Sequence, residues 1–197
     1  VGIYGPEGST RRADNEQWNF DSQVISKRVN YAYTALIATP SPNADHGISA
    51  SSQSLSRRVF RLNWNGSGRS FNFRIWDGSA RKINGNTTFG TNEFHIGTVV
   101  HDSDGLRMYV DGVLDNTSSA GLAQTGDNGV IALGNAEPNG NQRSELNWVL
   151  FIAHDYAPTA FEVENLHADP FAMLRPGPQL LPLLFGGAGA TGSTVTD

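Results

Sequence analysis

Apolar and polar residues alternate with a period of two between residues 92 and 114. Such alternation is typical of a β-strand with one buried face. Residues 102–105 (DSDG) and the pair Asp111-Gly112 are predicted to reverse the chain, because Gly and Asp tolerate the positive φ of tight hairpin turns. The region predicts an antiparallel meander with two apolar sets that each share a face: Phe94, Ile96, Thr98 and Val100, then Leu106, Met108 and Val110.

Other apolar stretches predict strands on both sides of the meander. They cover residues 31–39, 59–64, 71–76, 129–133 and 146–154. The last stretch is apolar at both alternating sets of positions, which predicts a central strand covered on both faces. The Ser-rich segment after Pro42, which contains Gly47, is predicted to be a loop.

One short helix is predicted near the C-terminal end. Thr159 and Glu162 have the spacing of a capping box, and Asp169-Pro170 ends the pattern. Phe161, Val163 and Leu166 are predicted to form its apolar face. The chain therefore predicts an all-β sandwich with one C-terminal helix.

Composition narrows the class of protein. The 197 residues fit one domain, and 22 Gly with 9 Pro suit short strands joined by tight turns. A net charge of −5 argues against nucleic acid as a partner, since phosphate binding needs clustered Lys and Arg. The absence of Cys excludes disulfides and thiolate chemistry, and no apolar run is long enough for membrane insertion. These features are typical of a microbial or viral protein that folds in a reducing cytoplasm.

The ends of the chain predict extended arms. Residues 1–22 are polar and Gly-rich, residues 23–171 carry the predicted sandwich, and residues 172–197 are rich in Pro and Gly. An apolar run in the C-terminal arm predicts docking on a neighbouring subunit and a homo-oligomer. The predicted docking residues are Leu180, Leu181, Leu183, Leu184 and Phe185.

Three segments resemble the laminin-G-like, concanavalin-type jelly-roll superfamily. They are YTALIATP, FHIGTVVHDSDGLRMYVDGVL, and GVIALGN followed by LNWVLFIAHDYAPTAFEVENLHADPF, which together cover roughly residues 30 to 171. The resemblance implies an antiparallel jelly-roll β-sandwich. The ending LHADPFAMLRP is similar to that of laminin-G-like proteins encoded among the head and tail genes of tailed bacteriophages. That similarity implies a virion protein, assembled in the host cytoplasm with capsid or tail subunits as partners.

Catalysis has little support in the sequence. His95 and the 109–112 run (YVDG) resemble β-glucan hydrolases, but retaining hydrolysis needs two carboxyl groups about 5 Å apart. The ExDxxE-type run of that family is absent, and Glu162 and Glu164 point apart on a helix. His95 and His101 would lie about 20 Å apart on one strand, too far to bind one metal. The chain is predicted not to be an enzyme, with β-glucan hydrolase as a remote alternative.

Calcium is the one cofactor with candidate ligands. Laminin-G-like modules often bind it at the rim of the sandwich through oxygen ligands, which suit a hard cation. Asp102, Asp104, Asp127 and Asn128 offer such oxygens in predicted loops. Ordinary turn chemistry also explains the same residues, so both interpretations stay open.

A glycan is the other candidate ligand. Arg74 and Trp76 alternate with the apolar set Phe71, Phe73 and Ile75, so they point to the opposite face of their strand. There Trp76 could stack on a sugar, although burial against an arm or the other sheet would also explain it. The sequence as a whole predicts a non-enzymatic virion structural protein, as capsid decoration or as a tail-fibre attachment. The alternative is a free carbohydrate-binding lectin that reads a cell-surface glycan.

Overall fold

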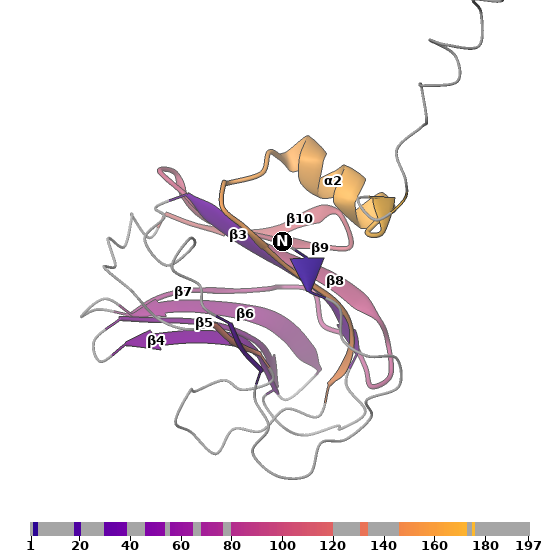
Figure 1. Cartoon of the computed structure of the whole chain (residues 1–197), viewed down its shortest axis with the longest axis horizontal. Helices are drawn as coiled ribbons and strands as arrows, with labels where there is room; N and C mark the ends of the chain where they lie inside the picture. Colours follow the sequence, from indigo (N-terminus) through magenta and orange to yellow (C-terminus); the bar gives the residue numbers. More distant parts are fainter. Residues whose placement is uncertain are drawn as a thin grey trace, which may run out of the picture.

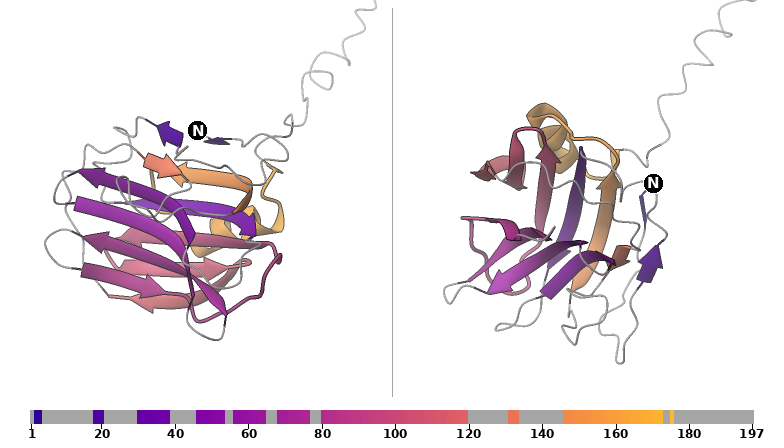
Figure 2. Two further views of the ribbon diagram at one scale, coloured as in Figure 1. Left: turned by 90° about the horizontal axis from the view of Figure 1, so that it is seen from below. Right: turned by 90° about the vertical axis from the view of Figure 1, so that its left-hand side faces the viewer.

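The computed structural model describes residues 2–3, 18–20, 30–38, 46–53, 56–64, 68–76, 80–119, 131–133, 146–172 and 175. In this part of the chain two six-stranded antiparallel sheets face each other as a sandwich (Figure 1, Figure 2). The predicted all-β jelly-roll sandwich is confirmed. The extended arms predicted at the two ends fall largely outside the described residues.

Sheet A contains the meander. Its order is β1 (Gly2–Ile3), β12 (Asn147–His154), β3 (Tyr31–Ala38), β8 (His95–Asp102), β9 (Gly105–Val110) and β10 (Val113–Ser118). Val110 pairs with Val113, so Asp111 and Gly112 form a two-residue turn, with φ of 50° and 87°. Positive φ at both central residues is the geometry that the right-handed twist of the strands favours. The predicted turn chemistry is confirmed for Asp111 and Gly112.

Sheet B faces sheet A with its own run of hairpins. Its order is β2 (Trp18–Phe20), β11 (Ile131–Leu133), β4 (His46–Gln53), β5 (Ser56–Trp64), β6 (Arg69–Trp76) and β7 (Ala80–Asn84). The loop predicted around Gly47 is wrong: this segment is β4, paired between β5 and β11. Its sequence HGISASSQ lacks alternating large apolar residues, so its strand state depends on its neighbours rather than on local pattern.

Aromatic side chains dominate the core between the sheets. The rings of Phe60 and Phe71 stack at 5.6 Å, and those of Tyr33 and Phe151 at 5.9 Å. Gly97 on β8 leaves room for one of these rings, because a Cβ at this position would lie 2.5 Å from Phe71. The second predicted apolar set, Leu106, Met108 and Val110, also lies in this core.

The first predicted apolar set faces the other way. Thr98 and Val100 are buried on the outer face of sheet A, under the helix α2 (Ala160–Ala168), whereas Val99 points into the core. Phe94 precedes β8 and is 55% exposed. The shared face is therefore confirmed for residues within β8, but it is not the face between the sheets.

The helix α2 covers this outer face (Figure 1). Thr159 and Glu162 form the predicted capping box, which is confirmed. Val163 packs against Ala32, Val100 and Tyr109, while Phe161 is 69% exposed. The predicted apolar face is wrong for Phe161, because residues two apart on a helix point in different directions. No helix in the described residues is long and apolar enough to cross a membrane.

Candidate functional site on the outer face of sheet B

The outer face of sheet B is the open face of the sandwich among the described elements. The helix α2 lies against sheet A, and no other described helix or strand lies over β4 to β7 (Figure 1, Figure 2). The strands β5, β6 and β7 pair in an unbroken antiparallel register. Residues that alternate with the core positions Phe60, Phe71 and Phe73 therefore point outward.

One outward row crosses three strands. Arg61 on β5 is in register with Asn72 on β6, which is in register with Asn84 on β7. Arg61 Nε donates to Asn72 Oδ1 at 3.0 Å, and Asn72 Nδ2 donates to Asn84 Oδ1 and to the carbonyl of Ile83. Asn72 is only 2% exposed, so the row is fixed at its centre. A guanidinium and two amides are thus held at fixed positions before any ligand binds.

The next outward row carries two cations. Arg74 is half-buried and lies directly opposite the exposed Lys82 on β7. Trp76, two residues further along β6, is in register with Arg57 and Ala80. The structure confirms that Arg74 points away from the core. The Trp76 side chain lies outside the described part, so its role as a sugar platform stays a prediction.

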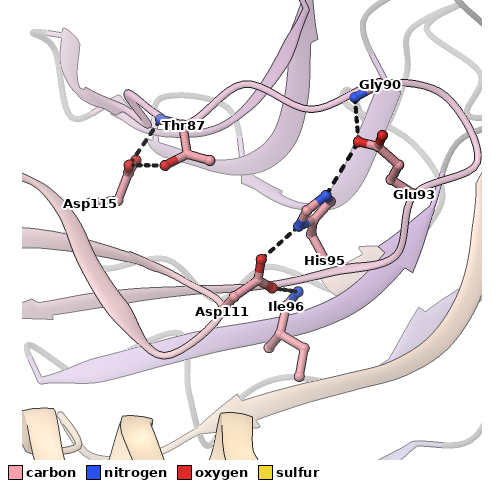
Figure 3. A network of polar contacts seen from close by, with 7 residues as sticks. All are labelled: Thr87, Gly90, Glu93, His95, Ile96, Asp111 and Asp115. Carbon is pink, nitrogen blue, oxygen red and sulfur yellow. Dashed lines mark hydrogen bonds and ion pairs between the residues drawn. The ribbon is translucent and has the colours of Figure 1, made fainter.

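A second polar network lies at the rim of the sandwich (Figure 3). His95 lies between two acids, with its Nδ1 2.7 Å from Asp111 Oδ2 and its Nε2 3.6 Å from Glu93 Oε2. Each acid also accepts a backbone N–H, Glu93 from Gly90 at 2.6 Å and Asp111 from Ile96 at 2.9 Å. These contacts tie the loop before β8 to the hairpin between β9 and β10.

Asp115 on β10 makes a similar tie to the loop after β7. It accepts from the backbone N–H groups of Asn86 at 2.6 Å and Thr87 at 2.9 Å, and from the Thr87 hydroxyl at 2.6 Å. The side chain of Asn116 donates to the carbonyl of Asn84, the last residue of the first outward row. Sequence reasoning missed both networks, because the partners are 15 to 32 positions apart, except for the contacts of Glu93 with Gly90 and His95.

Comparison with known proteins gives the family. A model described as the concanavalin A-like lectin/glucanases superfamily matches residues 13–146, well over half of the chain. The chain belongs to this superfamily. The laminin-G-like resemblance seen in the sequence is confirmed for the domain type. A search of curated proteins finds no match.

Solved structures of the same fold are distant in sequence. Domain 4 of an extracellular arabinanase from Geobacillus stearothermophilus, in complex with arabinotriose, has a TM-score of 0.57 and 12% identity over 78% of this chain and 82% of that one. A heptameric SAP-like pentraxin from Limulus polyphemus has a TM-score of 0.53 and 14% identity, covering 71% and 70%. The binding domain of botulinum neurotoxin serotype G has a TM-score of 0.64 and 15% identity over 87% of this chain, but only 45% of that domain. Such identities establish the shared fold alone.

Two of the four calcium candidates, Asp102 and Asp104, lie beside the guanidinium of Arg107. Asp102 accepts from the backbone N–H of Asp104 at 2.9 Å and forms an ion pair with Arg107. Asp104 lies 3.9 Å from the same guanidinium. No group of three or more His, Asp or Glu that could hold a metal occurs in the described residues. Asp127 and Asn128 lie outside them, so calcium binding stays a prediction.

The predicted assembly arm also lies outside the described residues. This applies to all five docking candidates, Leu180, Leu181, Leu183, Leu184 and Phe185. Docking on a neighbour therefore stays a prediction.

A partly buried chain of polar contacts links sheet A to the helix α2. His167 Nε2 lies 2.7 Å from Thr98 Oγ1, Thr98 lies 2.8 Å from Thr34 Oγ1, and Thr34 lies 3.1 Å from His154 Nε2. Burial lowers the pKa of both histidines to about 4. The three hydrogen bonds need three protons and the two hydroxyls supply two, so one imidazole donates.

The buried Nδ1 of His167 has no hydrogen-bond partner, so a proton there would be a stranded donor. His167 therefore donates from Nε2 to Thr98, Thr98 donates to Thr34, and Thr34 donates to His154. A proton on His154 Nε2 would reverse this direction. This series of hydrogen bonds thus stabilises two neutral imidazoles beneath the helix.

Proposed function

We propose that the chain is a non-catalytic carbohydrate-binding module whose ligand lies on the outer face of sheet B. The observation that carries this proposal is the fixed row Arg61, Asn72 and Asn84 on a face that no described element covers. Glycan sites combine a few placed polar groups with apolar or aromatic area. Arg61 and the exposed Asn84 supply the polar groups, and the buried Asn72 holds them in place. Trp76 on the same strand as Asn72 is the candidate aromatic residue.

Similar structures support a binding role. The arabinanase domain holds arabinotriose in its structure, and the neurotoxin relatives are receptor-binding domains. The three rim acids offer a poor catalytic pair, because Glu93, Asp111 and Asp115 each accept a backbone N–H that ties a loop. We expect no reducing ends to be released when the chain is incubated with β-glucans. Release at a rate above buffer would overturn the non-catalytic part of the proposal.

The test of the site is a glycan array with the full chain and two aromatic variants. Trp76→Ala should weaken binding by about tenfold or more, as expected when a stacking surface is removed. Phe161→Ala is the matched control, since Phe161 is an exposed aromatic residue on α2. The helix α2 lies against sheet A, away from the proposed site on sheet B. No binding to any glycan, or an equal loss in the two variants, would contradict the proposal.

We also propose, as the biological setting, that the module is carried on a virion of a tailed phage. This rests on the ending LHADPFAMLRP and on the composition of the two arms. Mass spectrometry and cryo-electron microscopy of purified particles test it. Many copies on a capsid lattice would support decoration, and a few copies at a tail would support attachment. Absence from particles would leave a free lectin.

A further inference from the structure

The helix α2 is attached to the sandwich but does not belong to its main core. Among the described residues, the large apolar cluster between the two sheets contains no member of α2. The helix instead packs in a second, small cluster on the outer face of sheet A, to which it contributes Val163, its one fully buried side chain. Segments with few buried apolar contacts open at a lower free energy than a core. Release of α2 would therefore leave the packing between the two sheets intact.

Two histidines lie where α2 meets sheet A. His167, near the end of the helix, has its Nε2 2.7 Å from the hydroxyl of Thr98 on β8. His154, the last residue of β12, has its Nε2 3.1 Å from the hydroxyl of Thr34 on β3. The two hydroxyls are 2.8 Å apart, so one series of hydrogen bonds joins both rings. The protonation state of these rings therefore bears directly on the contact between α2 and sheet A.

A proton on either ring conflicts with this series. His154 Nε2 accepts from Thr34, and a protonated Nε2 cannot accept. An added proton on His167 would occupy Nδ1, which is buried and has no hydrogen-bond partner. Burial lowers the pKa of both rings to about 4, whereas an exposed imidazole titrates at about 6.5. Acid therefore favours a state in which both rings reach water.

The charges around the two rings oppose this effect only in part. Asp155 and Glu162 favour the protonated form of His154, whereas the amino terminus of the chain disfavours it. Asp111 favours the protonated form of His167. Burial outweighs these carboxylates, since both pKa values stay at about 4. The other titratable groups around the rings are Glu164, Tyr109 and Tyr156.

We propose that α2 is an acid-released flap: when His154 and His167 take up protons, the helix leaves sheet A while the two sheets stay packed together. Release would expose the outer face of β3, β8 and β9, which carries Ala32, Val100 and Tyr109. The outer face of sheet B would be unchanged. This proposal is independent of the proposed function, because it concerns the opposite sheet and needs no ligand.

Single cysteines measure the release, because the chain has no cysteine of its own. Val163→Cys places a thiol at the buried position of α2, and Phe161→Cys places one on the exposed side of the same helix. Val99→Cys places a thiol in the core between the sheets. Each full-length variant is reacted with 4,4′-dithiodipyridine at pH 7 and at pH 4.5. The rate at position 161 corrects for the effect of pH on the thiol reaction itself.

The three positions should respond differently to acid. We expect the rate at position 163, divided by the rate at position 161, to rise about a hundredfold or more at pH 4.5, because two shifted groups titrate together. The rate at position 99, divided in the same way, should stay within about threefold, because the core strands open only at the highest free energies.

Histidine variants test whether these two rings cause the response. In the Val163→Cys chain, His154→Gln with His167→Gln should cut the response to less than about tenfold, since no buried imidazole remains to be protonated. Hydrogen exchange of the unchanged chain, followed by mass spectrometry, gives a second measurement that needs no substitution. Relative to their intrinsic exchange rates, the amides of α2 should lose protection at pH 4.5 while those of β8 keep it.

Three results would overturn the proposal. Equal protection of position 163 and of the α2 amides at the two pH values would show that acid does not release the helix. Parallel exposure of positions 163 and 99 would show that the sandwich opens as a whole. A response that persists undiminished without the two histidines would show that other groups drive it.

Discussion

The outer faces of the two sheets differ in what covers them and in the charge they carry. On sheet A, the helix α2 buries Val163 against Ala32, Val100 and Tyr109 and encloses two neutral histidines. On sheet B, the outward positions of β5 to β7 carry Arg61, Arg74 and Lys82 without a described element above them. The covered face thus stabilises the fold, whereas the face of sheet B is the one on which we propose that a ligand binds. The comparison predicts that substitutions on the two faces have different consequences.

The largest effect is expected under α2. Val163→Asp places a carboxylate at a fully buried position, and we expect the free energy of unfolding to fall by about 3 to 5 kcal/mol. Urea denaturation measures this loss, and Val163→Ala gives a smaller, graded loss of about 1 to 2 kcal/mol. Phe161→Asp on the exposed side of the same helix should change stability by less than about 0.5 kcal/mol. Similar losses at positions 161 and 163 would show that α2 does not pack against sheet A as described.

The second-largest effect is expected when acid protonates the two histidines beneath α2. Unfolded histidine titrates at 6.5, whereas His154 and His167 have folded pKa values of about 4. Between these values the unfolded state binds more protons, so the contribution of the two histidines to stability is constant above pH 6.5 and falls as the pH drops towards 4. We expect a loss of about 2 to 4 kcal/mol for the pair, allowing for the partial exposure of both rings.

Urea denaturation of the unchanged chain and of a variant without both histidines, across this pH range, isolates their contribution to the free energy of unfolding. His154→Gln with His167→Gln should flatten the slope between pH 6.5 and 4, while carboxylates elsewhere titrate in both proteins. An unchanged slope in the double variant would mean that these histidines are not held neutral beneath the helix.

The smallest effect is expected on the open face. Lys82→Glu places a carboxylate opposite Arg74, and we expect it to raise the free energy of unfolding by about 0.5 kcal/mol, because repulsion becomes attraction. Chemical denaturation measures this change. A loss of stability would show that Lys82 already contributes to the fold.

Local patterns predicted much of the fold. The Asp111-Gly112 turn and the Thr159–Glu162 capping box each depend on residues close in sequence, and both formed as predicted. The strand β4 could not be predicted in this way, because its small polar residues become a strand only between β5 and β11. The sequence also did not show which face of β8 lies in the core, because Gly97 and His101 on the inner face are not large apolar residues.

The candidate site was predicted only in part. Alternation along β6 placed Arg74 outward, but Arg61 and Asn84 join the site through cross-strand register rather than through spacing along one strand. The clustering of cations on β4 to β7 was a signal available in the sequence. Its meaning depends on knowing which of these residues point outward and which, like Arg69, are buried.

Nuclear magnetic resonance titration of the isotopically labelled full chain, with a glycan that binds on the array, shows where the ligand lies. We expect the backbone shifts that change to concentrate on β5 to β7, around Arg61, Arg74 and Lys82. Shift changes confined to α2 and sheet A, or to the rim loops near His95, would contradict the assignment of the ligand to the outer face of sheet B.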